Sequence, residues 1–313
     1  NSYPIVIDTI IPEHKGFDYQ IEHYKNSNCF YILSDYNAPN FCLYKADVND
    51  VKQEHWVQVI PESDNFEIVS ARLLDSVFVL TIRDGLSQNI AVYDTLNKTC
   101  ENIIKSKGLH YSSIIRVLSN RIIIKDETYL SPANYFKFDL KTSELNLLGA
   151  DSINNYNSKN YEYVVKYAKS SDGFNIPIVL ISHKNTKLKN TPVYAMTYGG
   201  GGKVYAPHFD EALVPILDQG FAVAYILVRG GGESGLFLQK SSIKNQSVSD
   251  ITDFATGIEY LILNEISSPD KIFAYGKSNG GFIMGNMANY YPEYFNGIIL
   301  DVPYFDVLTD FSN

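Results

Sequence analysis

The stretch that decides the fold is KIFAYGKSNGGFIMGNMANYY, residues 271–291. Its beginning, KIFAYG, is a short apolar run of the kind that forms a buried strand, and its end, FIMGNMANYY, has the apolar spacing of a helix. The turn between them contains the pattern G-x-S-x-G, made by Gly276, Ser278 and Gly280. In a strand–turn–helix context this pattern predicts a strained turn that exposes a serine hydroxyl, with glycines where side chains would collide with the neighbouring strand and helix.

Ser278 is therefore the candidate nucleophile. The N-terminus of the following helix directs backbone N–H groups, including that of Asn279, towards the place where an oxyanion would form. Two other interpretations are open: an ordinary glycine-rich turn with an inert serine, and a phosphate-binding loop. The second is disfavoured because neither G-x-x-x-x-G-K-[ST] nor G-x-G-x-x-G is present at this turn.

Two further glycine-rich segments follow apolar strands. Tyr198 precedes the glycines 199–202 at the end of TPVYAMTY, and Arg229 begins RGGGESG at the end of FAVAYILV. Both lie at the carboxyl ends of predicted strands, where open α/β sheets place their sites. The Tyr198 hydroxyl is a candidate donor to an oxyanion, although the same run also fits a flexible loop. Arg229 and Glu233 fit either a substrate anchor or a structural ion pair.

Strands alternate with helices through the second half of the chain. Residues 161–170 and 175–183 predict a hairpin, and helices are expected around 209–218 and 247–264. In the longer helix Asp250 and Asp253 fall in the first turns, where acidic groups favour the helix dipole. Near-continuous apolar strands separated by helices indicate a parallel sheet covered on both faces.

The first half, residues 17–148, reads as short β-type runs separated by polar turns, which predicts an antiparallel meander. Groups of four strands in about 40–50 residues are typical of propeller blades, and this stretch would hold roughly three. Three blades cannot close a ring, so the open edges would need further blades or a partner; a sandwich is the alternative. The polar segment 151–159 is the predicted linker, which gives domains at 1–158 and 159–313.

Charge and composition indicate which kinds of partner and which location to expect. The net charge of −9 argues against nucleic acid, because phosphate binding needs a basic surface. Cys29, Cys42 and Cys100 are an odd number without paired spacing, which predicts free thiols rather than disulfides or a zinc site. No apolar run is long enough for a transmembrane helix, and the first residues do not form a secretory signal, so we expect a cytoplasmic location and no membrane partner.

Three motifs in a fixed order carry a resemblance to a known family. TYGGGG (197–202), LVRGGGESG (227–235) and GKSNGG (276–281), followed by LDVPYFDVLTDF (300–311), resemble the catalytic-domain signatures of the prolyl oligopeptidase family of serine peptidases. Upstream, residues 16–47 look most like oligopeptidase B. The resemblance implies a partial β-propeller followed by part of an α/β-hydrolase domain with a parallel sheet. It also implies Ser278 as nucleophile, Tyr198 and the backbone N–H of Asn279 as the oxyanion hole, and no metal or organic cofactor.

The end of the chain departs from the family pattern. In α/β-hydrolases the triad acid and base follow the serine in the order Ser, Asp, His, yet no histidine occurs among residues 279–313. We expect Asp301, Asp306 and Asp310 to serve the structure, and His208 to be a solvated loop residue. The chain is therefore expected to be a fragment that lacks the first propeller blades and the triad Asp and His, and to be inactive as a peptidase by itself.

The expected function is hydrolysis of short peptides, with oligopeptidase B-like cleavage after Arg or Lys. One alternative is a post-proline oligopeptidase, because SNGG around Ser278 fits it at least as well. Another is a catalytically dead remnant that acts as a binding or assembly module. The expected partners are short peptide substrates and either a complementary C-terminal segment or a further copy, joined through open sheet edges.

Overall fold

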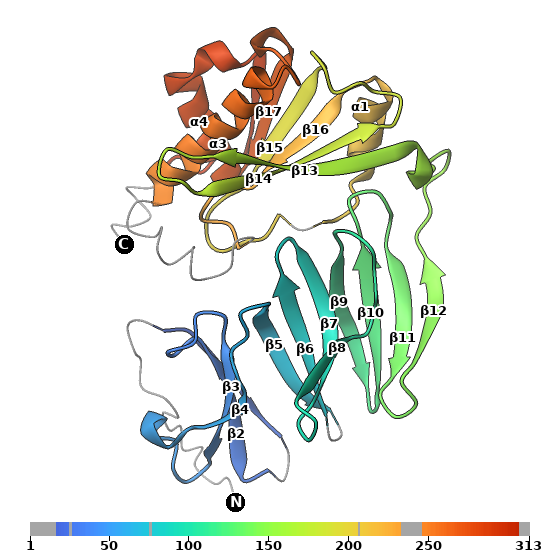
Figure 1. Ribbon diagram of the computed structural model, residues 1–313, viewed down its shortest axis with the longest axis vertical. Helices are drawn as coiled ribbons and strands as arrows, with labels where there is room; N and C mark the ends of the chain where they lie inside the picture. The colour runs from blue at the N-terminus through green and yellow to red at the C-terminus, as the bar shows by residue number, and fades with distance from the viewer. Residues whose placement is uncertain (1–16, 25–26, 75–76, 206, 233–245, 307–313) are drawn as a thin grey trace, which may run out of the picture.

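The computed structural model describes residues 17–24, 27–74, 77–205, 207–232 and 246–306 (Figure 1). The chain forms antiparallel sheets up to Ala150 and, from Tyr161 onwards, a mixed sheet flanked by helices. None of the helices within these ranges is long and apolar enough to cross a membrane.

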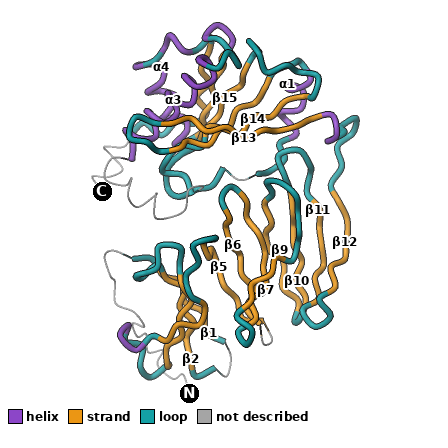
Figure 2. The backbone as a smooth tube through the Cα atoms, in the orientation of Figure 1, coloured by secondary structure: helices purple, strands orange, loops and turns teal. Residues whose placement is uncertain are grey.

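The antiparallel part consists of three consecutive groups of four strands (Figure 2). The first group is a separate sheet, ordered β1-β2-β3-β4, and the other two join into one sheet through the parallel pair Gln88 and Tyr111. The bounds are β1 (Tyr19–His23), β2 (Cys29–Ser34), β3 (Cys42–Asp47), η1 (Gln53–His55), β4 (Val57–Ile60), β5 (Glu67–Leu74), β6 (Val77–Asp84), β7 (Ser87–Asp94), β8 (Thr99–Asn102), β9 (Tyr111–Leu118), β10 (Arg121–Glu127), β11 (Asn134–Asp139) and β12 (Glu144–Ala150). The predicted antiparallel meander is confirmed.

The three groups pack face to face because the middle one is apolar on both sides. In β6, Leu80 packs with Leu43 and Ile68 in one buried cluster. Its neighbour Val79 packs with Ile122 in another. Since successive residues of a strand point to opposite faces, the second group lies between the first and the third.

The second part of the chain is a six-stranded sheet in the order β13-β14-β16-β15-β17-β18. The strands β13 (Tyr161–Lys169) and β14 (Asn175–His183) form the predicted hairpin, and β14 is antiparallel to β16 (Ala222–Ile226). The strands β15 (Val193–Thr197), β16, β17 (Ile272–Lys277) and β18 (Gly297–Asp301) run parallel to one another. The expectation of a parallel sheet therefore holds for the four strands that follow the hairpin.

Helices cover both faces of this sheet. On one face lie α3 (Gln246–Leu263) and α4 (Asn279–Tyr290), whose Phe254 and Ile283 pack in one buried cluster with the small residues Ala195 and Ala224 of the sheet. On the other face lies α1 (Val214–Asp218), next to the hairpin strands in Figure 1. Short 3-10 turns complete this part: η2 (Ser158–Asn160), η3 (Glu211–Leu213), η5 (Pro269–Lys271) and η6 (Pro292–Tyr294).

The helical segment formed by η3 and α1 begins later than expected. The sequence predicted a helix over residues 209–218, but the helical turns start at Glu211. Asp210 has an extended backbone, with φ −115°, and its side chain accepts a hydrogen bond from the N–H of Ala212. Asp210 is therefore the N-cap, and residues before it cannot join the helix.

The antiparallel part and the mixed sheet meet in a cluster of aromatic side chains. Tyr129, from the loop after β10, stacks on Tyr225 with ring centroids 5.2 Å apart, and its hydroxyl donates to the carbonyl oxygen of Tyr205 at 3.2 Å. The N–H of Leu109 donates to the hydroxyl oxygen of Tyr163 at 2.7 Å. These contacts hold the antiparallel strands against the sheet face that also carries α1.

Candidate active site

Ser278 lies between β17 and α4, at the point where the sequence predicts a sharp turn. Its backbone has φ 54° and ψ −113°, an unusual conformation for a residue with a side chain. A Cβ at Gly276 would lie 2.1 Å from the carbonyl oxygen of Gly280, and a Cβ at Gly280 would lie 2.4 Å from that of Thr197. Both positions are thus closed to any side chain, which is the physical reason for the glycines of G-x-S-x-G.

Backbone hydrogen bonds hold the serine in this conformation. The N–H of Ser278 donates to the carbonyl oxygen of Asp301 at 2.9 Å, and its own carbonyl accepts from the N–H of Tyr304 at 3.1 Å. The hydroxyl does not cap the helix, and the side chain is half-buried. The hydroxyl is therefore not used to stabilise the fold locally.

Tyr198 and Asn279 come together beside this serine. Thr197 at the end of β15 is paired in register with Gly276 of β17, so Tyr198 leaves the sheet next to the turn. The side-chain amide of Asn279 donates to the carbonyl oxygens of Tyr198 and Gly199, both at 2.9 Å. The structure thus brings the three candidate residues of the site together, and Asn279 links its two chain segments.

The glycines after Tyr198 form the loop that this amide holds. Gly199, Gly200, Gly201 and Gly202 all have positive φ, between 57° and 79°. A Cβ at Gly200 would lie 2.7 Å from Nδ2 of Asn279. The four glycines therefore suit the positive φ of this backbone, Gly200 also allows the close approach of Asn279, and the segment is a loop held by defined hydrogen bonds. We call residues 198–202 the glycine loop.

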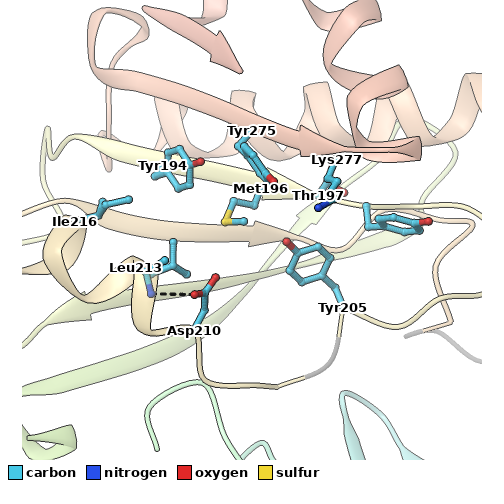
Figure 3. A pocket seen from close by; sticks show the side chains of 11 residues that line it. Tyr194, Met196, Thr197, Tyr205, Asp210, Leu213, Ile216, Tyr275 and Lys277 are labelled. Atoms are coloured by element: carbon cyan, nitrogen blue, oxygen red, sulfur yellow. Dashed lines mark hydrogen bonds between the residues drawn. The ribbon is translucent and has the colours of Figure 1, made fainter. Parts of the chain in front are cut away.

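A pocket of about 400 Å³ opens next to the turn (Figure 3). Its lining includes Tyr198, Lys277, which directly precedes Ser278, and the aromatic side chains of Tyr194, Tyr205 and Tyr275. Ser278 itself is not part of the lining, so the pocket lies beside the hydroxyl rather than around it. The sequence analysis did not identify these aromatic residues, because their alternation along strands is also typical of an ordinary core.

Asp301 serves the structure of this region, as expected. The hydroxyl of Tyr275 donates to its Oδ2 at 2.8 Å, and Nζ of Lys277 lies 3.5 Å from the same oxygen. Burial and the hydrogen bond to Asp301 raise the pKa of Tyr275 to about 12. Asp301 is thus already engaged by two side chains of β17.

Arg229 is the centre of an ion-pair network. Its Nε and Nη2 donate to the two carboxylate oxygens of Asp253 at 2.9 and 2.8 Å, and its Nη1 donates to Asp172 of the β13–β14 hairpin. The guanidinium also stacks on Phe174, 5.0 Å from the ring centroid. Of the two interpretations of Arg229, this geometry supports the structural ion pair; Glu233 lies outside the described residues.

The two acidic residues that were expected to favour the helix dipole lie beyond the first turn of α3, which contains no acidic residue. Asp253 is fully buried and holds Arg229, and Asp250 is 3% exposed. Burial, together with the neighbouring Asp253, raises the pKa of Asp250 to about 8, and Arg229 only partly opposes this. The sequence pattern could not show this burial, because both positions would suit a solvent-exposed first turn equally well.

No histidine in the described part of the chain is hydrogen-bonded to Ser278, whose hydrogen bonds are all made by its backbone. His110 is buried in the antiparallel part, where its Nε2 lies 2.6 Å from Oδ1 of Asn89. His208 lies beside Tyr205, with ring centroids 6.3 Å apart. Among the described residues, no group of three or more His, Cys, Asp and Glu side chains is arranged to hold a metal ion.

Two family models match this chain. The prolyl oligopeptidase N-terminal β-propeller domain matches residues 5–151, and the prolyl oligopeptidase family matches residues 207–313. Protease 2 of Moraxella lacunata is 27% identical over 301 residues, which cover 94% of this chain and 42% of the relative. Prolyl endopeptidase of Dictyostelium discoideum is 26% identical over 321 residues, which cover 98% and 42%.

The fold is also that of a solved relative. The structure described as oligopeptidase B from Trypanosoma brucei with covalently bound antipain, in a closed form, superposes with a TM-score of 0.90 at 22% identity. The superposition covers 97% of this chain and 45% of that structure. The chain therefore spans less than half the length of the relatives that it matches.

Proposed function

Because this chain belongs to the prolyl oligopeptidase family of serine peptidases, we propose that it supplies the nucleophile and the oxyanion-binding groups of an enzyme that hydrolyses short peptides. The observation that carries the proposal is the strained turn at Ser278, tied to the glycine loop by the side chain of Asn279. In the proposed site, the glycine loop and the N-terminus of α4 would supply two donors to an oxyanion, the Tyr198 hydroxyl and the backbone N–H of Asn279.

In the proposed reaction, Oγ of Ser278 attacks the carbonyl carbon of the peptide bond while a histidine takes its proton. The carbonyl oxygen becomes an oxyanion, which accepts hydrogen bonds from Tyr198 and from the N–H of Asn279. The intermediate then collapses, the amine leaves with the proton from the histidine, and the acyl group stays on Ser278. Water, activated by the same base, hydrolyses this ester and restores the serine.

We place the general base outside the described residues. The family order puts the acid and the base after the serine, and no histidine occurs among residues 279–313. A serine hydroxyl without a positioned base is a poor nucleophile. The 313 residues alone are thus expected to be nearly inactive and to need a complementary segment that carries the Asp and the His.

For substrates we propose cleavage after Arg or Lys, as the resemblance to oligopeptidase B suggests. A post-proline preference is the second candidate, because Asn279 follows the serine in the motif SNGG and because a prolyl endopeptidase is about as similar to this chain as Protease 2 is. Residues 235–238, where the family usually has a tryptophan of the substrate pocket, lie outside the described residues. Short fluorogenic peptides ending in Arg, Lys or Pro separate the two preferences.

Labelling by a fluorophosphonate tests the nucleophile. We expect the 313-residue chain to react slowly, with a rate that barely changes with pH near neutrality. Addition of the Asp- and His-bearing segment, in cis or as a separate polypeptide, should speed the reaction by about a thousand-fold or more, and Ser278→Ala should abolish it.

Two outcomes contradict parts of this proposal. Rapid, Ser278-dependent labelling of the 313 residues alone would mean that they contain a base, and His208 would be the first residue to mutate. If the completed protein remains as slow as Ser278→Ala, the chain is a catalytically dead remnant, and a binding or assembly role replaces the enzymatic one.

A further inference from the structure

Asp250 is a buried acid that the proposed reaction does not use, yet it touches the glycine loop. It lies in α3 with 3% of its surface exposed. A Cβ built at Gly199 would lie 3.2 Å from its Oδ2, so the carboxyl group is in close contact with the residue that follows Tyr198. Its Oδ1 is buried and has no hydrogen-bond partner among the described residues.

The surroundings of Asp250 offer little to balance a negative charge. Arg229 is the cation that lowers the pKa of Asp250, and its guanidinium is already shared by Asp253 and Asp172. The two other atoms nearest to a Cβ built at Gly199 belong to apolar side chains, Val228 in the segment after β16 and Ile283 in α4. An ionised Asp250 would be a third carboxylate around one guanidinium, which is costly at a buried position.

We propose that Asp250 is a positioning residue that supports the glycine loop only in its protonated form, and that loss of this proton displaces the loop and weakens the oxyanion hole. The part concerning the oxyanion hole rests on the proposed function. Two effects act in the same direction. An unpaired buried anion draws water or a cation towards itself and so opens the contact with Gly199, and a negative charge beside Tyr198 opposes a developing oxyanion.

The direction of the pH dependence follows from burial. Because burial raises the pKa of Asp250 to about 8, the folded protein keeps a proton that the unfolded chain releases near pH 4. The stability that this proton gives is complete below about pH 4 and is lost as the pH rises through about 8. The glycine loop should therefore be ordered at neutral pH and loosen above pH 8.

Hydrogen exchange and thermal melting test this without any need for catalysis. In the protein at its native length, amide exchange of the peptide that contains residues 198–203 is measured at pH 6.5 and 9, with correction for intrinsic rates, for the wild type and for Asp250→Asn. We expect the wild type to lose protection in this peptide at pH 9, and Asp250→Asn, which stays neutral, to keep it. The melting temperature of Asp250→Asn relative to the wild type should also rise between pH 5 and 8.

The matched control is Asp126→Asn, because Asp126 is another buried acid whose pKa burial raises, but it lies on β10, in the antiparallel part. It should change the pH dependence of melting and leave exchange at 198–203 as in the wild type. Exchange at 198–203 that is equally pH-dependent in the wild type and in Asp250→Asn would overturn the proposal. A difference in melting temperature between the wild type and Asp250→Asn that does not vary with pH would also overturn it.

A functional arm separates this inference from the proposed function. If Ser278 of the native-length protein is labelled rapidly, the labelling rate of the wild type should fall above pH 8 and the labelling rate of Asp250→Asn should not. A fall in both rates would overturn the role of Asp250 in the oxyanion hole. Where Ser278 is not labelled at all, the proposed function fails, and the exchange and melting results still decide whether Asp250 supports the loop.

Discussion

The proposed role of the Tyr198 hydroxyl depends on how the residue is held. The ring is held from one side by Nζ of Lys203, 5.3 Å from its centroid, and its carbonyl oxygen is held by the amide of Asn279. Because these two contacts restrict the residue, we propose that its hydroxyl is preorganised. A preorganised donor stabilises a transition-state oxyanion more than it stabilises a bound substrate.

Tyr198→Phe should therefore lower the rate constant of the completed enzyme by about ten- to a thousand-fold and change the KM little. The matched control is Tyr194→Phe, which removes a hydroxyl from the same pocket but from a position further back on β15. The comparison is made with steady-state kinetics on short peptides. A wild-type rate constant for Tyr198→Phe would exclude its hydroxyl from the oxyanion hole.

At the scale of elements, the packing of α4 against β15 and β17 decides the geometry of the turn. The helix approaches so closely that backbone meets backbone: a Cβ at Gly280 would lie 2.4 Å from the carbonyl oxygen of Thr197. A main-chain atom of an interior strand cannot move aside as a flexible side chain can. The close approach is therefore a property of the helix–sheet pair.

Gly280→Ala should destabilise the protein by about 1–3 kcal/mol, in spite of the higher helix propensity of alanine, because α4 has to move away from the sheet. Gly285→Ala is the matched control in the same helix. Its new Cβ would crowd the side chain of Phe305, which is 56% exposed and free to turn away, and would lie at an ordinary contact distance of 3.7 Å from Leu300. Urea unfolding measures both, and equal stabilities for the two variants would refute the backbone contact.

On the scale of the whole molecule, one arginine connects the antiparallel part to the site region. Nη1 of Arg83, on β6, donates to Oε2 of Glu67 and to the carbonyl oxygen of Gly232, both at 2.9 Å. The side chains of Arg83 and Glu67 are 13% and 7% exposed. Burial raises the pKa of Glu67, and Arg83 counteracts this.

Removing this arginine should leave a buried acid without its partner. We expect Arg83→Met to lower the free energy of unfolding by about 3–5 kcal/mol near pH 8. The loss should be smaller at pH 5. Without Arg83 the pKa of Glu67 rises further, so the folded variant binds a proton at low pH. The stability that this proton gives disappears as the pH rises. The control is Arg121→Met, which breaks the pair with Asp139 at a 53% exposed arginine and should cost only about 0–1 kcal/mol. A pH-independent loss in Arg83→Met would contradict this account.

The strands β12 and β18 each form an edge of their sheet. The last antiparallel strand, β12, is exposed along its whole length, and the edge strand β18 exposes Ile299 by 50% and Leu300 by 38%. Apolar side chains on a strand that is paired on one side only favour association. Association of the 313-residue chain, with a further copy or with a complementary segment, stays a prediction.

The sequence by itself determined the features that depend on neighbours in the chain. The turn at Ser278 follows from glycines two residues on either side of the serine, and the two halves of the fold follow from the change in apolar spacing near residue 160, because backbone sterics and side-chain periodicity are local properties. Only the tertiary structure decided which groups are buried together. The amide of Asn279 binds a carbonyl 81 residues away, and Arg83 binds one 149 residues away. Asp250 became a buried acid rather than a partner of the helix dipole because the glycine loop lies against it, and burial of this kind arises between segments whose distance along the chain no sequence pattern records.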